Sequence, residues 1–91
     1  MIYRLFLTEE FDRCLGKISK SAREGIEKKF LTYVGPQLKQ EPHFGLNIRK
    51  LRGYDPETWR YRIGRFRVFY LIDEKDRIVK VLSIEQRKDA Y

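Results

Sequence analysis

Arginine alternates with apolar residues through much of residues 59–70, a pattern that few structures accommodate. Arginine occupies every second position within Trp59–Ile63 and returns at Arg65 and Arg67. Such alternation predicts two β-strands with apolar side chains on one face and guanidinium groups on the other. Like charges that face each other across neighbouring strands destabilise a sheet. A row of arginines therefore suggests that this face binds phosphate.

The pair Gly64-Arg65 separates the two strands and sets their register. A two-residue turn with glycine first suits a type II′ hairpin. This turn pairs Ile63 with Phe66, Arg62 with Arg67, Tyr61 with Val68, and Trp59 with Tyr70. Two arginines then face each other, and the aromatic side chains share the opposite face, where we expect the core.

A third strand comes next in the chain, and its register is set by keeping apolar side chains together. With strands at residues 66–73 and 77–85, a three-residue turn pairs Ile72 with Ile78, Val68 with Leu82, and Phe66 with Ile84. The same register places further side chains on the face of Arg67: Phe69, Leu71, Val79, Val81, Ser83, Glu85 and Arg87. That face is predicted to be partly apolar and partly basic, which suits a cleft, a base-stacking surface or a partner groove.

The first half of the chain predicts a strand and two helices. Residues 2–7 read as a mostly buried strand. Thr8 is expected to cap a helix over residues 9–17, because its hydroxyl can accept a bond from the first helical turn. Ser21 and Glu24 have the spacing of a capping box, which opens the second helix.

Turn-forming residues punctuate the middle of the chain. Gly35-Pro36 interrupts or ends the second helix, although residues to Gln40 could form a further turn. Residues 41–45 read as a loop that contains His43, the only histidine, which we expect to be an ordinary surface residue. A short strand is expected at residues 47–51.

Size and charge limit the classes of function. The chain has 91 residues, enough for one small domain over residues 1–91. A net charge of +7 and a pI near 9.7 favour polyanionic partners, which include RNA, DNA, an acidic protein segment or a membrane surface. The single cysteine, Cys14, excludes an intramolecular disulfide and a cysteine-based zinc site, and we expect it to be a small buried residue. No signal peptide or membrane-spanning run is recognised, so we expect a cytoplasmic protein with no membrane partner.

Four sequence blocks, in this order, resemble the RelE/ParE superfamily of toxin–antitoxin toxins. They are Lys50-Leu51-Arg52-Gly53, Trp59-Arg60-Tyr61-Arg62, the segment from Gly64 to Tyr70, and the segment from Val81 to Tyr91. The resemblance spans essentially the whole chain. It implies an α+β microbial RNase fold: an N-terminal strand, a two-helix hairpin and then an antiparallel β-sheet. It also implies the RelE activity, cleavage of messenger RNA in the ribosomal A site, and an acidic antitoxin that neutralises the basic toxin by wrapping it.

The resemblance implies catalytic roles for arginines of the alternating segment. Arg67 matches the family's arginine on the central strand, which holds the scissile phosphate. Arg60 and Arg62 match a pair of basic residues on the preceding strand, which are often lysines in relatives.

Residues outside that segment also match functional positions of the family. Arg87 matches a C-terminal arginine near the leaving group, and Tyr91 matches a tyrosine near the reactive nucleotide. Arg52 matches a basic residue that helps to seat RNA, and Lys50, in the same block, is expected to bind RNA as well. Lysines on the helices add non-specific attraction to ribosomal RNA.

The implied reaction is attack by the RNA 2′-hydroxyl on the adjacent phosphorus, which leaves a 2′,3′-cyclic phosphate and a 5′-hydroxyl. It requires no metal ion and no cofactor. Arginine suits charge stabilisation of the transition state, because its planar fork binds phosphate oxygens bidentately and stays charged. Arginine is a poor general base for the same reason. Glu85, on the predicted active face, is the candidate base, but we rank alignment of the RNA on the ribosome together with arginine stabilisation first.

Two other functions remain compatible with the sequence. A ParE-like toxin shares the fold but inhibits DNA gyrase as a binding protein. A non-catalytic relative would keep the basic face for RNA or ribosome binding without turnover. The absence of lysine or histidine at the usual acid–base positions keeps this option open. Basic residues on both hairpin strands, together with Arg87 and Tyr91, favour cleavage.

Overall fold

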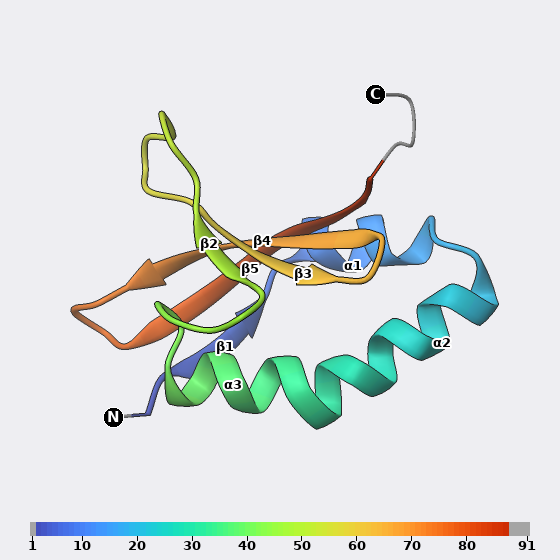
Figure 1. The fold of residues 1–91 in the computed structure, drawn as a ribbon, viewed down its shortest axis with the longest axis horizontal. Helices are drawn as coiled ribbons and strands as arrows, with labels where there is room; N and C mark the ends of the chain where they lie inside the picture. The colour runs from blue at the N-terminus through green and yellow to red at the C-terminus, as the bar shows by residue number, and fades with distance from the viewer. Residues whose placement is uncertain (1, 88–91) are drawn as a thin grey trace.

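A five-stranded sheet organises the molecule, with strand order β1-β5-β4-β3-β2 (Figure 1). The computed structural model describes residues 2–87. The strands are β1 (Arg4–Leu7), β2 (Ile48–Lys50), β3 (Trp59–Ile63), β4 (Phe66–Asp73) and β5 (Ile78–Gln86). Strand β1 runs parallel to β5, whereas all other neighbouring strands are antiparallel. The expected α+β class is confirmed, and the first strand of the chain lies beside the last.

The helical hairpin consists of α1 (Glu9–Gly16) and α2 (Lys20–Lys29). Thr8 caps α1 as predicted, because its hydroxyl oxygen accepts a hydrogen bond from the main-chain N–H of Phe11 at 3.1 Å. The predicted capping box at Ser21 is wrong, since α2 begins at Lys20. Its N-cap residue, Ser19, makes no side-chain capping bond.

The turn between α1 and α2 is held in a different way. Ile18, within this turn, packs against the core. The Arg23 guanidinium donates to the carbonyl oxygens of Gly16 at 3.3 Å and of Ile18 at 3.5 Å. A side chain from within α2 thus donates to carbonyl oxygens of the turn, whereas a capping hydroxyl would accept from N–H groups at the start of the helix.

Gly35-Pro36 does not end the second helix. A π-helical segment, Phe30–Val34, follows α2 directly and leads into α3 (Gly35–Gln40). Proline lacks an N–H donor, and its ring displaces the carbonyl four residues earlier in an α-helix. A wider π turn relieves this clash, so the helix continues through the proline.

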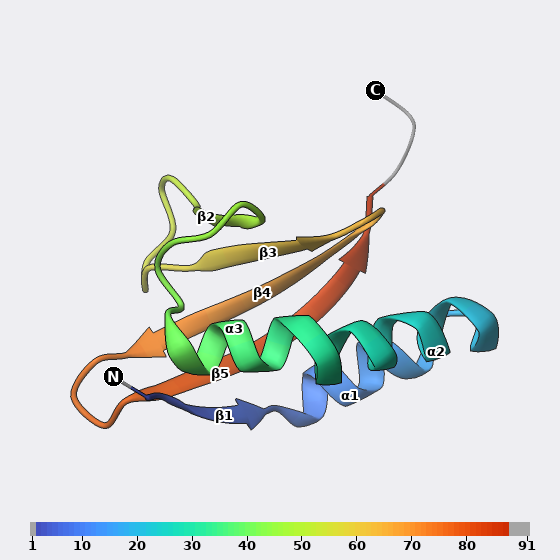
Figure 2. The same ribbon diagram turned by 60° about the horizontal axis from the view of Figure 1, so that its bottom comes forward.

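The core lies between the helices and one face of the sheet (Figure 2). Its buried side chains come from both layers: Tyr3, Phe11, Ile26, Phe30, Val34, Leu38, Tyr61, Ile63, Val68, Tyr70, Val79, Val81 and Ile84. Tyr70 is fully buried, and its hydroxyl donates to the Pro42 carbonyl oxygen at 2.8 Å. Within residues 2–87, no helix is both long and apolar enough to cross a bilayer.

The register of the first hairpin is confirmed at every predicted pair. Ile63 lies opposite Phe66, Arg62 opposite Arg67, Tyr61 opposite Val68, and Trp59 opposite Tyr70. Gly64 has a φ of 56°, in the region that glycine adopts without strain. The two-residue turn therefore fixed the register locally.

The predicted register of the second hairpin is wrong. Val68 pairs with Ile84, Phe66 with Gln86, and Ile72 with Val79. The connecting loop holds residues 74–77, one more than predicted. A bulge opposite Phe69 and Tyr70 also leaves Leu82 without a partner on β4.

This bulge changes which side chains of β5 enter the core. A regular strand alternates faces, so it cannot bury residues 79, 81 and 84 together. One extra residue in the strand shifts the alternation by one position. Val79 and Val81, expected on the face of the arginines, are therefore completely buried in the core, together with Ile84.

Candidate phosphate-binding site

The sheet face turned away from the helices carries the arginines. Arg60 and Arg62 alternate in β3 with the buried Tyr61 and Ile63. Arg67 lies directly opposite Arg62 on β4. The hairpin therefore brings together the three arginines that the sequence placed at the catalytic site.

A fourth arginine, Arg49, joins this group from β2. It lies opposite Arg60 in the β2–β3 register, and paired residues of neighbouring strands project to the same face. We call the surface formed by Arg49, Arg60, Arg62 and Arg67 the arginine face. Sequence reasoning missed Arg49, although pairing the predicted strand 47–51 with the strand 59–63 would have identified it.

Arg60 experiences both burial and electrostatic repulsion on the arginine face. Burial lowers the pKa of Arg60, and the positive charges of Arg67, Arg62 and Arg49 lower it further. The Nε atoms of Arg60 and Arg67 are both buried and have no hydrogen-bond acceptor. Within residues 2–87, none of the four arginines forms an ion pair. Clustered charges and unsatisfied donors of this kind are what an anion would stabilise.

Other side chains complete this side of the sheet. Glu85 lies opposite Arg67 and is exposed, but it forms no ion pair with that arginine. Phe69 is half-buried between Arg60 on β3 and Ser83 on β5. As expected, Glu85 and Ser83 share the side of Arg67, and the surface combines basic, acidic and aromatic groups.

Lys50 and Arg52 lie apart from this group. Lys50 pairs with Trp59, whose face of β3 is the core side, and its ammonium group forms an ion pair with Glu57 at 2.9 Å. Arg52 is exposed in the turn after β2. The alternation along β2 therefore turns Lys50 away from the side on which Arg49 stands.

The predicted C-terminal residues lie at the end of β5. Arg87 is exposed, and its main-chain N–H donates to the carbonyl oxygen of Arg65 at 2.7 Å. This bond extends the antiparallel pairing beyond Gln86 and brings the Arg87 main chain to the turn of the β3–β4 hairpin. Tyr91 lies outside the described residues.

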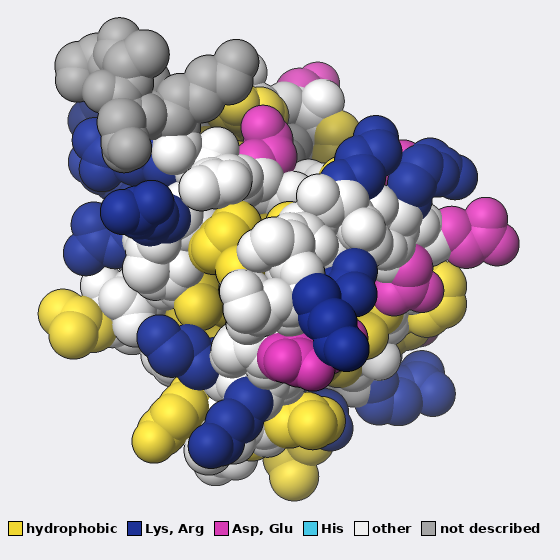
Figure 3. All heavy atoms as spheres, turned by 90° about the vertical axis from the view of Figure 1, so that its right-hand side faces the viewer, with side chains coloured by type: hydrophobic (Ala, Val, Ile, Leu, Met, Phe, Trp, Pro, Cys, Tyr) yellow, Lys and Arg dark blue, Asp and Glu magenta, His cyan; other side chains and the backbone are white. Residues whose placement is uncertain are grey.

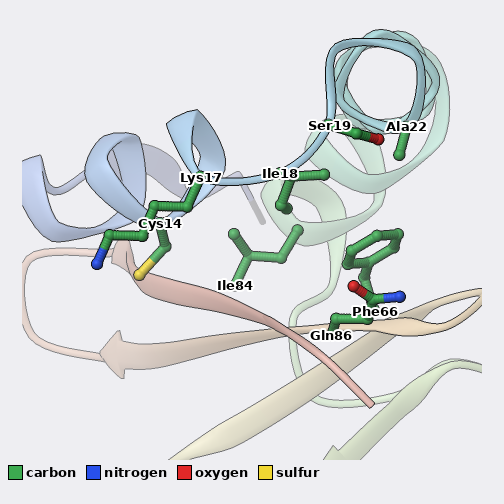
Figure 4. Close-up of a pocket in the computed structure, with 8 residues that line it drawn as sticks. All are labelled: Cys14, Lys17, Ile18, Ser19, Ala22, Phe66, Ile84 and Gln86. Atoms are coloured by element: carbon green, nitrogen blue, oxygen red, sulfur yellow. The ribbon is translucent and has the colours of Figure 1, made fainter. Parts of the chain in front are cut away.

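A separate hollow of about 340 Å³ lies between the α1–α2 turn and the ends of β4 and β5 (Figure 4). Its lining residues are Cys14, Lys17, Ile18, Ser19, Ala22, Phe66, Ile84 and Gln86. Lys17 is the one charged residue of this lining. Cys14 is half-buried rather than fully buried, and its thiol lies 3.4 Å from a Glu10 carboxylate oxygen. This hollow lacks the concentration of charge found on the arginine face.

The side of the molecule near this hollow has an uneven charge distribution (Figure 3). Along one edge of the view, Lys and Arg side chains stand without Asp or Glu among them. Elsewhere in the view the two kinds of charge are interspersed. The net charge of +7 is thus not spread evenly.

His43 belongs to a different cluster. Its Nδ1 lies 2.7 Å from a Glu41 carboxylate oxygen, and its Nε2 contacts Glu74. Its ring also packs edge-on against Trp59, with 5.5 Å between ring centroids. The expectation of an ordinary surface histidine is wrong, because His43 ties the loop after α3 to the β4–β5 loop. Among residues 2–87, no group of three or more acidic, His or Cys side chains is arranged to hold a metal ion.

Comparison with known proteins places this chain in a family. A curated relative, putative toxin RelE1 of Methanocaldococcus jannaschii, is 42% identical over 50 residues, which are 55% of this chain and 54% of that protein. The match thus spans about half the length of the relative.

Two solved structures share the whole fold. The archaeal RelE–RelB complex of Pyrococcus horikoshii contains a chain with 27% identity and a TM-score of 0.71, covering 99% of this chain and 100% of that one. The RelBE2 toxin–antitoxin complex of Mycobacterium tuberculosis gives 24% identity and the same TM-score of 0.71, with coverage of 96% and 100%. Both neighbours are toxin–antitoxin complexes.

A family model also matches nearly the whole chain. The model described as ParE toxin of type II toxin–antitoxin systems, parDE, matches residues 5–91. This match covers nearly the whole chain and agrees with the resemblance to the RelE/ParE superfamily. The chain belongs to this family of type II toxin–antitoxin toxins.

Proposed function

We propose that this toxin is a ribosome-dependent endoribonuclease that cleaves messenger RNA in the A site. The observation that carries the proposal is the arginine face, where four guanidinium groups gather without an anionic partner among residues 2–87. The RNA 2′-hydroxyl gives up its proton and attacks the adjacent phosphorus to form a 2′,3′-cyclic phosphate. The bond to the 5′-oxygen breaks, and that oxygen takes up a proton to leave as a 5′-hydroxyl. Arg67 and Arg62 stabilise the charge that develops on the phosphate oxygens.

Arg67→Ala tests this role most directly. Loss of a preorganised donor to the transition state lowers the rate by roughly 10²–10³-fold. The measurement is primer extension on messenger RNA bound to programmed ribosomes. Wild-type protein should produce new stops within A-site codons and none on naked messenger RNA, and Arg67→Ala should abolish them.

Two control variants separate charge from geometry. Lys75→Ala removes one positive charge from the exposed β4–β5 loop, at the opposite end of β4 from Arg67, and should cleave as the wild type does. Arg67→Lys keeps the charge but loses the bidentate fork, so it should stay well below the wild type. Retained cleavage by Arg67→Ala, with a wild-type circular dichroism spectrum, would contradict the assignment of Arg67.

Inhibition of DNA gyrase is the second candidate function, because the matching family model carries the ParE name. A gyrase inhibitor requires a binding surface but no catalytic one. The wild-type protein would then block supercoiling by purified gyrase and leave ribosome-bound messenger RNA intact. The two assays therefore discriminate between the two functions.

The partners follow from the same surface. We propose that an acidic antitoxin neutralises the toxin by covering the arginine face, which the net charge of +7 supports. The structural neighbours in complexes with RelB support an antitoxin of that class. Messenger RNA and ribosomal RNA in the cytoplasm would be the other polyanions that this surface binds.

A further inference from the structure

We propose that Arg49 and Arg60 form a second phosphate site, which holds a phosphodiester of single-stranded RNA next to the one held by Arg62 and Arg67. This inference rests on the proposed function and deepens it. It assigns Arg49, outside every motif that pointed to the family, as an RNA-binding residue.

The sheet register provides the first argument. Arg49 faces Arg60 across β2 and β3, and Arg62 faces Arg67 across β3 and β4. The two arginine pairs are therefore offset by two residues along β3 and by one strand across the sheet. Two residues rise about 6.6–6.8 Å along a strand and neighbouring strands lie about 4.7–4.9 Å apart, so the midpoints of the two pairs are about 8 Å apart. This offset is comparable to the spacing of successive phosphates in an extended single strand.

Charge balance provides the second argument. One phosphodiester carries a single negative charge, so the Arg62–Arg67 pair already exceeds it. Arg49 and Arg60 would remain uncompensated beside a single bound phosphate, and repulsion among neighbouring strands would persist. A second phosphate neutralises the second pair and relieves the repulsion that acts on Arg60.

The free hydrogen-bonding groups provide the third argument. The buried Nε–H of Arg60 has no acceptor, and neither has the buried Nε–H of Arg67. One such group belongs to each pair. A phosphate at each pair would supply the missing acceptors, whereas a single phosphate at Arg62–Arg67 leaves that of Arg60 unsatisfied.

The kinetic experiment uses Arg49→Ala on programmed ribosomes. Arg49 would bind a phosphate that does not react. Loss of the Arg49 side chain should therefore weaken RNA binding equally in the ground state and in the transition state. We expect KM for the programmed ribosome to rise roughly tenfold, the low end for a charge-assisted hydrogen bond because Arg49 is exposed. The value of kcat should stay within about twofold of wild type. Arg67→Ala should instead lower kcat, and Lys75→Ala should change neither constant.

A substituted messenger RNA identifies the phosphate. Methylphosphonate linkages, which carry no charge, replace the phosphate on either side of the scissile one in turn. One of these substitutions should raise KM for the wild type as Arg49→Ala does. On that RNA, Arg49→Ala should have no further effect. Additive effects at both positions would overturn the second site.

A binding measurement makes the inference independent of cleavage. The probe is a short 2′-O-methyl RNA, which lacks the attacking hydroxyl and stays intact. The logarithm of its binding constant falls with the logarithm of salt concentration by about 0.7 per phosphate neutralised on a single strand. Arg49→Ala should therefore reduce the slope by about 0.7, and Lys75→Ala should leave it unchanged.

The outcomes separate the two proposals. If the wild type does not cleave but Arg49→Ala reduces the salt slope, the second phosphate site stands and the proposed reaction fails. If the wild type cleaves and Arg49→Ala matches Lys75→Ala in KM and slope, the second site is wrong. If the wild type neither cleaves nor binds the RNA probe, both fail.

Discussion

Arg60 shows how a single residue can serve binding at the expense of folding. Its guanidinium is partly buried, lies among three other arginines and carries an N–H without an acceptor. Each of these properties disfavours the free folded protein. Natural proteins keep such features mainly where a ligand compensates for them.

Arg60→Met tests this trade-off. Methionine retains the length of the side chain and removes the charge and the unsatisfied donor. We expect the free energy of unfolding of the free toxin to increase by about 1 kcal/mol, while RNA cleavage falls. Urea denaturation measures the first effect. A loss of stability in Arg60→Met would show that the arginine face is not strained.

Glu85 is the residue whose role is least determined by its surroundings. It lies opposite Arg67 without an ion pair, so it is available as a base. We nevertheless expect Glu85→Gln to slow cleavage by less than tenfold, because alignment and arginine stabilisation carry most of the rate. The pH–rate profile should keep its shape. A loss of 10²–10⁴-fold together with loss of the acidic limb would instead identify Glu85 as the general base.

At the scale of elements, the Thr8 hydroxyl connects the start of α1 to strand β5 of the sheet. Thr8 accepts from Phe11 at the start of α1, and its hydroxyl lies 2.9 Å from the Val81 carbonyl oxygen on β5. Ser19 precedes α2 in the equivalent position but makes no side-chain capping bond. The two residues thus form a matched pair for measuring what the cap contributes.

Thr8→Ala should lower the free energy of unfolding by about 0.5–2 kcal/mol, the range for loss of a capping side chain. Ser19→Ala should change it by less than about 0.5 kcal/mol, as for a surface position without such a contact. Both values come from urea denaturation followed by circular dichroism. Equal effects of the two substitutions would mean that the Thr8 bonds contribute little.

The elements differ in how well the sequence predicted them. The β3–β4 register was predictable because the Gly64-Arg65 turn determines it within a few residues. The β4–β5 register was not, since the bulge at Leu82 serves to bury Val79, Val81 and Ile84 at once. That requirement comes from the helices, which pack on the core face of the sheet. The local alternation of residues along β5 does not encode this packing.

The residues of the candidate site also differ in how well the sequence predicted them. Arg60, Arg62 and Arg67 could be placed together because one hairpin carries them. Arg49 was missed and Lys50 was favoured in its place, because a motif match says nothing about the face to which a strand residue points. The register between β2 and β3 decides which residue joins the arginine face, because it places Arg49 opposite Arg60 and Lys50 opposite Trp59.

At the scale of the whole molecule, the His43 cluster joins three distant segments. Glu41 follows α3, Glu74 lies between β4 and β5, and Tyr3 precedes β1 and donates to Glu74 at 2.7 Å. Arg77 lies over the Tyr3 ring, 5.6 Å from its centroid. Titration of this cluster should therefore affect the stability of the entire fold.

The pKa shifts give the sign of this effect. Burial opposes protonation of His43, but its hydrogen bonds to Glu74 and Glu41 outweigh burial and raise its pKa above 6.5. The bond from the His43 main chain, followed by that from its ring, lowers the pKa of Glu41, and bonds from Tyr3 and His43 lower that of Glu74, both from 4.5. The histidine contribution is complete below pH 6.5 and is lost as pH rises through the raised pKa. The carboxylate contributions are present above pH 4.5 and are lost as pH falls, so the cluster stabilises most between these values.

His43→Gln measures this contribution. The glutamates are about half exposed, so we expect a modest effect of about 0.2–1 kcal/mol. The loss of unfolding free energy in His43→Gln should be larger at pH 6 than at pH 8.5. Urea denaturation of both proteins at the two pH values gives the comparison, and an equal loss at both would show that the histidine charge is unimportant.

The parallel pairing of β1 with β5 joins strands from opposite ends of the described segment, which has a consequence for folding. Strand β5 lies between β1 and β4 and supplies Val79, Val81 and Ile84 to the core, yet within residues 2–87 it follows all the other strands in the chain. The nascent chain cannot close its sheet until that strand has left the exit tunnel. The core therefore forms only after every other described element has been synthesised, so it depends on contacts between residues far apart in the sequence.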